Sequence, residues 1–132
     1  PKGRSVIGYE KLKAQPQILL VDDDLFILDM WKLESQDAEI ISFRSPTECL
    51  RYLKDKPDAI DQVQFVVTDF LFNNDAMNGA ELARQLKKLR PELEIFAATD
   101  APKLAAAATS EFKDVLSKRV YSCEELASRT SL

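Results

Sequence analysis

Five short apolar runs, each followed by a more polar stretch, constrain the fold of this chain more than any other feature. Continuous apolar runs of this length are typical of strands that are buried on both faces of a parallel sheet. Their alternation with amphipathic stretches predicts an open, doubly wound α/β sheet with helices on both faces. The runs predict strands over 17–21 (QILLV), 38–43 (AEIISF), 64–70 (QFVVTDF), 93–99 (LEIFAAT) and 112–118 (FKDVLSK).

Helix-capping patterns support this alternation. Ser45 and Glu48 have the spacing of a capping box, and Asn78 and Glu81 repeat it before the next amphipathic stretch. A proline suits the first turn of a helix, as at Pro46, and ends the helix that precedes it. The expected helices cover 25–35, the stretch from Pro46 to before Pro57, 79–90, about 102–109, and a last stretch from Ser122.

The size and charge of the chain restrict its function. The 132 residues suit one domain over 17–132, preceded by a polar tail or linker over 1–16. The net charge of -4 argues against nucleic-acid binding, which needs clustered Lys and Arg. No stretch reaches the ~20 apolar residues of a membrane span, and no signal peptide is visible, so we expect a cytoplasmic location.

The chain contains no histidine, which excludes several kinds of site. A catalytic triad with a histidine base, a histidine-ligated zinc site and a phosphohistidine carrier are all ruled out. The two cysteines, Cys49 and Cys123, form no disulfide framework and fit a reducing compartment. Both lie in apolar-periodic stretches, which favours core packing over a reactive thiol.

Charged and hydroxyl side chains lie at the carboxyl ends of four of the five predicted strands. In sheets of this type the functional site lies at the carboxyl ends of the strands. If the strands concerned are neighbours, these side chains converge. The residues are Asp22, Asp23 and Asp24 at the end of the first strand, Asp69 at the end of the third, Thr99 and Asp100 at the end of the fourth, and Lys118 at the end of the fifth.

A cluster of carboxylates and one ammonium predicts phosphoryl chemistry. Neighbouring carboxylates raise one another's pKa, and a hard cation such as Mg²⁺ relieves their repulsion. Lys118 and the hydroxyl of Thr99 could then bind phosphoryl oxygens. A carboxylate such as Asp69 can itself be the nucleophile and form an aspartyl-phosphate.

Simpler structural roles exist for the same residues. Asp24 can cap the following helix, as can Asp100 before Pro102, and the whole acidic run from Asp22 can do the same. Asp69 can be an ordinary loop acid. Thr99 can be a β-branched strand residue, and Lys118 a solvated surface lysine.

The order and spacing of ILLVDDD, VVTDF, MNG, IFAATDA, VLSK and SCEEL resemble the receiver domain of two-component response regulators. The resemblance covers residues 17–128. It implies the flavodoxin-like (βα)5 fold, with a five-stranded parallel sheet, and Mg²⁺ as cofactor. It also assigns roles: Asp69 as phosphoacceptor, Asp22, Asp23 and the backbone carbonyl of Leu71 as metal ligands with Asp69, Thr99 as the switch hydroxyl, and Lys118 as the phosphate-pairing lysine.

The same resemblance implies partners. The phosphoryl donor would be a sensor histidine kinase or a histidine phosphotransfer domain, in agreement with the absence of histidine here. The phosphorylated domain would then switch an output domain or a downstream protein, and homodimerisation stays open. Such a domain is not an enzyme in the usual sense, because it catalyses only its own phosphorylation and slow dephosphorylation.

Several positions depart from the family pattern. Asp100 replaces a small residue, Val115 stands where a switch aromatic is common, and Arg119 replaces a proline. The loop between Asp69 and Gly79 is longer than usual and lacks its common proline. These departures leave open an alternative, a degenerate pseudo-receiver that acts as an interaction module without phosphorylation. A phosphohydrolase is disfavoured, because Leu71 stands where such enzymes carry a second aspartate.

Overall fold

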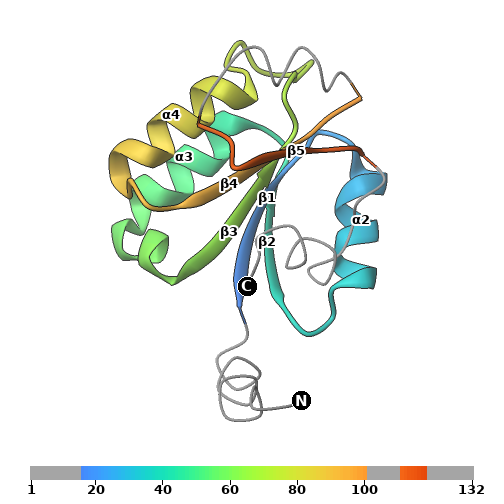
Figure 1. The fold of residues 1–132 in the computed structure, drawn as a ribbon, viewed down its shortest axis with the longest axis horizontal. Coiled ribbons are helices and arrows are strands. Elements are labelled where there is room, and N and C mark those ends of the chain that lie inside the picture. The colour runs from blue at the N-terminus through green and yellow to red at the C-terminus, as the bar shows by residue number, and fades with distance from the viewer. Residues whose placement is uncertain (1–15, 101–110, 119–132) are drawn as a thin grey trace.

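A five-stranded parallel sheet forms the centre of the molecule (Figure 1). The computed structural model describes residues 16–100 and 111–118. The strand order is β2-β1-β3-β4-β5, so β1 and β3 lie in the middle of the sheet. This confirms the doubly wound α/β prediction. The strands are β1 (Gln17–Val21), β2 (Glu39–Phe43), β3 (Val63–Thr68), β4 (Glu94–Ala98) and β5 (Asp114–Leu116).

The connecting helices begin at the predicted caps. They are α2 (Leu25–Glu34), α3 (Pro46–Asp55) and α4 (Gly79–Leu89), with a 3-10 helix η1 (Pro57–Gln62) before β3. Ser45 Oγ accepts from the backbone N–H of Glu48 at 3.2 Å. The Glu48 carboxylate accepts from the N–H of Arg44, one residue before the cap. The expected tail over 1–16 (apart from Pro16), the helix near 102–109 and the helix from Ser122 lie outside the described residues.

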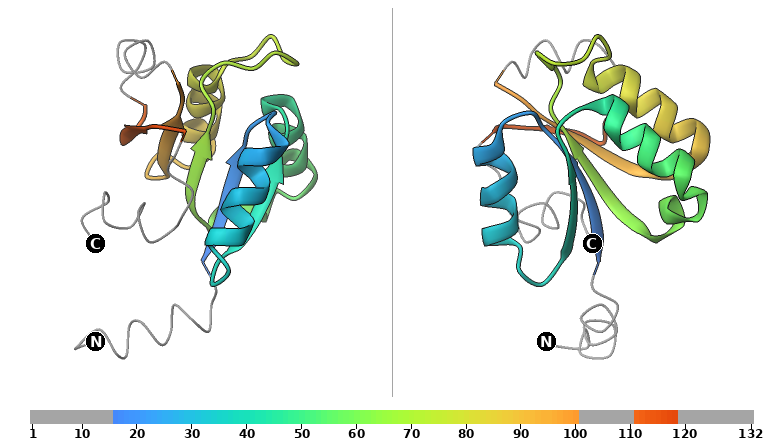
Figure 2. Two further views of the ribbon diagram at one scale, coloured as in Figure 1. Left: turned by 90° about the vertical axis from the view of Figure 1, so that its right-hand side faces the viewer. Right: turned by 180° about the vertical axis from the view of Figure 1, so that it is seen from behind.

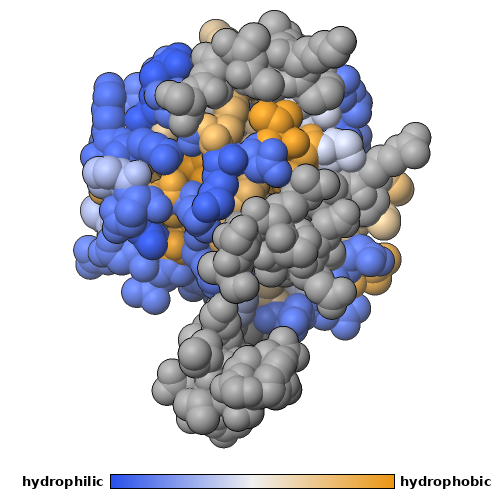
Figure 3. Space-filling view, in the orientation of Figure 1, coloured by the Kyte–Doolittle hydropathy of each residue, from blue (hydrophilic) through white to orange (hydrophobic). Residues whose placement is uncertain are grey.

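Helices cover both faces of the sheet (Figure 2). On one face, Ile27, Leu28 and Trp31 of α2 pack on apolar side chains of the central strands. On the other face lie α3 and α4, whose apolar side chains form a second cluster with the strands. On the side of the molecule that Figure 3 shows, exposed apolar residues lie among hydrophilic ones. In the described part of the chain, no helix is long and apolar enough to span a membrane.

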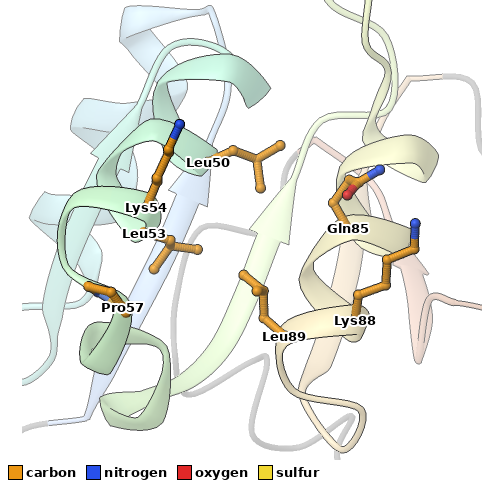
Figure 4. A pocket seen from close by; sticks show the side chains of 7 residues that line it. All are labelled: Leu50, Leu53, Lys54, Pro57, Gln85, Lys88 and Leu89. Carbon is orange, nitrogen blue, oxygen red and sulfur yellow. The ribbon is translucent and has the colours of Figure 1, made fainter.

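An open groove of about 490 Å³ lies between α3 and α4 (Figure 4). Leu50 and Leu53 of α3 face Leu89 of α4 across it, and the ammonium groups of Lys54 and Lys88 extend away from the apolar floor. None of these residues follows a strand at the carboxyl edge of the sheet. The groove is therefore separate from the acidic side chains described below.

The thiol of Cys49 is expected to be inert in the folded protein. Cys49 is fully buried in the α3–α4 cluster, as predicted, and burial raises the pKa of its thiol from 9.0 to about 12. Iodoacetamide at pH 8 should therefore alkylate it at least ~100-fold more slowly in native protein than in urea, because only the thiolate reacts. Peptide mass mapping separates Cys49 from Cys123, which lies outside the described residues. Equal rates at Cys49 in both states would contradict its burial.

Candidate functional site

The carboxyl ends of β1 and β3 bring three carboxylates together. Val21 pairs with Thr68 in the parallel register, so Asp22 and Asp69 leave the sheet side by side. The N–H of Asp69 still donates to the carbonyl of Val21 at 2.8 Å. One carboxylate oxygen each from Asp22, Asp23 and Asp69 lies within 4.8 Å of the others. The convergence expected from the sequence is therefore present.

Lys118 adds an ammonium group to this cluster. It follows β5, and its Nζ donates to Asp22 Oδ2 at 2.9 Å and to Asp69 Oδ2 at 2.8 Å. All three side chains are largely removed from solvent, with 17% of Lys118, 2% of Asp22 and 9% of Asp69 exposed. A solvated surface lysine, the alternative open at the sequence level, does not fit this geometry.

Burial and hydrogen bonds act in opposite directions on the charges of the site. Burial raises the pKa of Asp22 and of Asp69 above the usual value, although hydrogen bonds from Lys118 counteract part of this effect. For Lys118, burial alone would lower the pKa, but the hydrogen bonds to Asp69 and Asp22 together with the charges of these carboxylates raise it. The two buried carboxylates thus share one cation, and a further cation would favour their charged forms.

Backbone amides orient each carboxylate of the cluster. Asp22 Oδ1 accepts from the N–H of Asp24 at 2.9 Å, and Asp69 Oδ1 accepts from the N–H of Phe70 at 2.7 Å. Asp23 Oδ2 accepts from the N–H of Asn73 at 3.1 Å. Asp24 has a different role, because its side chain accepts from the N–H of Phe26 and caps α2. Of the acidic run, Asp24 is the residue for which the capping interpretation holds.

The donor set of the cluster fits Mg²⁺. It consists of carboxylate oxygens from three residues, without nitrogen or sulfur ligands among the described residues. Mg²⁺ prefers hard oxygen ligands and usually keeps several water molecules in its coordination shell. A site at the edge of the sheet leaves room for such water. Asp23 is half-buried and Asp69 is buried, so the cluster reaches from the interior to the surface. Asp22, Asp23 and Asp69 would hold the ion.

Most of the other predicted site residues that the structure describes lie in or after β3, β4 and β5. Thr99 is buried directly after β4, and its N–H donates to the carbonyl of Leu116 at 3.0 Å. Asp100 follows it and is exposed. Val115, in β5, packs at the cluster formed by Phe70, Ala80 and Ala97. The side chain of Leu71 is 52% exposed. Arg119 lies outside the described residues.

Gly79 is a site residue whose reason the sequence did not reveal. A Cβ at this position would lie 2.2 Å from the backbone oxygen of Asp69 and 3.0 Å from the Cα of Phe70. The N–H of Gly79 also donates to the carbonyl of Phe70 at 2.7 Å. The start of α4 therefore rests directly on the backbone of the predicted phosphoacceptor. The signals in the sequence were the Asn78-Gly79 pair at a helix start and the MNG motif, and neither showed this close approach.

No protein-family model matches the sequence, and no curated protein matches it, but solved structures do. A signal receiver domain of an HD domain-containing protein from Pseudomonas fluorescens has a TM-score of 0.70 and 24% identity, over 89% of this chain and 92% of the other. The response regulator TrrA from Thermotoga maritima, solved in complex with Mg²⁺ and BeF, has a TM-score of 0.70 and 21% identity, over 89% and 97%. This chain has the receiver-domain fold.

A third receiver domain has a similar fold. The CheY-like response regulator receiver domain from Methanospirillum hungatei has a TM-score of 0.66 and 21% identity, over 89% of this chain and 91% of the other. The receiver fold found here is thus the one that the sequence motifs implied. In this receiver fold, the acidic cluster lies at the carboxyl ends of β1 and β3.

Proposed function

We propose that this chain is a phosphorelay receiver domain that accepts a phosphoryl group on Asp69 in a Mg²⁺-dependent reaction. The observation that carries the proposal is the pair of hydrogen bonds from Lys118 Nζ to Asp22 and Asp69, with Asp23 beside them. A buried ammonium among three carboxylates is a costly arrangement for a merely structural role. It suits a site that receives a divalent cation and an anionic group.

The proposed reaction follows from the positions of these side chains. Oδ2 of Asp69 attacks the phosphorus of a phosphohistidine, the P–N bond breaks, and the imidazole leaves and takes up a proton. Lys118 Nζ donates a hydrogen bond to Asp69 Oδ2 before the reaction and would then donate to a phosphoryl oxygen instead. The hydroxyl of Thr99 would donate to another phosphoryl oxygen. When bound at these carboxylates, Mg²⁺ would neutralise part of the negative charge on the phosphoryl oxygens. Asp22, Asp23 and Asp69 would hold the cation, and the backbone carbonyl of Leu71 would be a further ligand.

The donor in this proposal is another protein or domain, because the chain has no histidine. A sensor histidine kinase or a histidine phosphotransfer domain fits, and an output domain or a downstream protein would respond. The site would then act in the cytoplasm. The chain would catalyse only its own phosphorylation and slow dephosphorylation, since Leu71 offers no acid or base beside Asp69. Leu71 and Ala101 stand two residues after Asp69 and Thr99, and neither has a polar side chain that could place a hydrolytic water. The double variant Leu71→Asn, Ala101→Glu should therefore shorten the phosphoryl lifetime, measured as the loss of the added mass with time.

A phosphorylation assay tests the proposed function. Incubation with acetyl phosphate and Mg²⁺ should add the mass of one phosphoryl group, as measured by intact-protein mass spectrometry. The Asp69→Asn variant should show no gain, because it lacks the nucleophile. Asp61→Asn, an exposed substitution in η1, is the matched control and should behave like the wild type.

The same assay distinguishes the proposed function from the pseudo-receiver alternative. Val115 in place of an aromatic and the charge of Asp100 favour that alternative, in which the fold serves only as an interaction module. A folded wild-type protein that gains no mass with acetyl phosphate and shows no binding of beryllofluoride with Mg²⁺ would support it. A mass gain that persists in Asp69→Asn would show that another residue accepts the phosphoryl group.

A further inference from the structure

The long loop between β3 and α4 is hydrogen-bonded to Asp23 of the acidic cluster, to the β2–α3 connection and to the first turn of α3. We call residues 73–75 of this loop the strap. The N–H of Asn73 donates to Asp23 Oδ2 at 3.1 Å, and the side-chain amide of Asn74 donates to the carbonyl of Arg44 at 3.0 Å. The N–H of Thr47 donates to Asp75 Oδ2 at 2.9 Å. Each residue of the strap thus makes one bond outside its own loop.

Asp75 is the anchor of the strap. Its Oδ1 accepts from the N–H of Met77 within the loop at 3.0 Å, while its Oδ2 accepts from Thr47 in the first turn of α3. The first turn of a helix has unpaired N–H donors and favours negative charge. The carboxylate of Asp75 therefore fills a position that α3 leaves open, and this fixes the strap relative to the sheet.

Arg44 completes the connection to the acidic cluster. Its Nη2 donates to the backbone carbonyl of Asp23 at 3.2 Å, and its own carbonyl accepts from Asn74. Asp23 is thus held twice, at its carboxylate by the strap and at its backbone by Arg44. Of the three carboxylates in the cluster, it is the least buried, so it has the most freedom to lose.

We propose that Asp75 and Arg44 are positioning residues that hold Asp23 ready to bind Mg²⁺. This inference rests on the proposed function only in taking Mg²⁺ as the ion. A ligand that is already ordered loses less conformational entropy on binding, so preorganisation increases affinity. By linkage, bound Mg²⁺ should in turn stabilise the bonds of the strap.

The Arg44→Gln variant tests the proposal most sharply, because two explanations predict opposite signs. If Arg44 acted only through its charge, removing a cation near the site would tighten Mg²⁺ binding. If it positions Asp23, the loss of its bond should weaken Mg²⁺ binding about tenfold, as for other residues that orient metal ligands. Isothermal titration calorimetry measures the dissociation constant. Arg51→Gln, exposed on α3, is the matched control and should bind Mg²⁺ like the wild type.

Two substitutions of Asp75 separate its hydrogen bonds from its charge. Asp75→Asn keeps the shape and one carbonyl acceptor, whereas Asp75→Ala removes both acceptors. We expect Asp75→Ala to weaken Mg²⁺ binding about tenfold and Asp75→Asn to weaken it less. Equal losses in both variants would assign the effect to charge, and unchanged affinity in Asp75→Ala with a Mg²⁺-binding wild type would overturn the positioning role alone.

Amide hydrogen exchange gives a readout that does not depend on phosphorylation. In the wild type, Mg²⁺ should slow the exchange of the Asn73 and Thr47 amides. In Asp75→Ala these amides should exchange faster even without Mg²⁺, because the anchor is gone. Unchanged exchange at both amides in this variant would contradict the strap. A wild type that binds no Mg²⁺ at all would overturn the metal-dependent function and the positioning role together.

Discussion

Replacing Lys118 by alanine is expected to cost about 3 kcal/mol or more of folding free energy at neutral pH, because it leaves Asp22 and Asp69 as buried carboxylates without their cation. The variant should also lose most of its phosphoryl uptake, since no ammonium remains to pair with the incoming group. Urea denaturation of the metal-free proteins, followed over a range of pH, measures the first effect.

The pH dependence of this loss has a definite sign. Burial raises the pKa of Asp22 and Asp69 in the folded protein, so the folded state binds their protons more tightly than the unfolded state does. The free energy of unfolding therefore falls as the pH rises through these raised values. Without Lys118 the pKa values rise further. The difference between variant and wild type should be largest at neutral pH and shrink on acidification.

Lys113→Ala is the matched control for this prediction. Its ammonium lies 3.1 Å from Glu94, but both side chains are substantially exposed, at 41% and 32%. Exposed ion pairs contribute roughly 0–1 kcal/mol, so this variant should be nearly as stable as the wild type. If Lys118→Ala and Lys113→Ala cost the same, the pairing of Lys118 with the buried carboxylates would not be important for stability.

Replacing Gly79 by alanine should destabilise the protein, although the substitution adds only one methyl group. Alanine favours a helix over glycine by up to ~1 kcal/mol, which alone would stabilise α4. A Cβ at 2.2 Å from the oxygen of Asp69 is impossible, however, and the atoms it meets are backbone. Overpacking of this kind costs about 1–3 kcal/mol, so we expect a net loss. Thermal unfolding measures it.

The same substitution should slow phosphoryl transfer. To relieve the contact, either α4 or the backbone of Asp69 and Phe70 must move, and Asp69 then loses its position beside Lys118. Lys88→Ala, on the exposed side of α4, is the control and should change stability by less than about 0.5 kcal/mol. A Gly79→Ala variant that is more stable than the wild type would show that helix propensity dominates here.

Much of this arrangement could be predicted because it depends on regular structure. Parallel strands end at one edge, so acids after β1 and β3 meet there whatever the loops do. The residues at which the strands end were predicted less accurately. The expected strand over 64–70 ends at Thr68, because Asp69 and Phe70 leave the sheet to form the site. The expected strand over 112–118 is reduced to Asp114–Leu116, which are the residues that pair with β4.

The strap could not be predicted, because nothing in the sequence shows which loops meet. Asp75 reads as one acid in a polar loop, and its bond to Thr47 joins residues 28 positions apart. Arg44 likewise looks like a solvated residue before a capping box. Gly79 shows that a residue type can be noticed without its reason, since the close approach to Asp69 depends on how α4 packs.

The ammonium group of the site depends on the short strand β5, whereas the carboxylates do not. The three carboxylates follow the interior strands β1 and β3, whereas the ammonium of Lys118 follows β5, a three-residue edge strand that pairs only with β4. Edge strands with few pairs open more readily than central ones. Asp22, Asp23 and Asp69 also leave the ribosome before Lys118 during synthesis. Opening of β5 alone should therefore separate Lys118 from Asp22 and Asp69, while the other four strands stay paired.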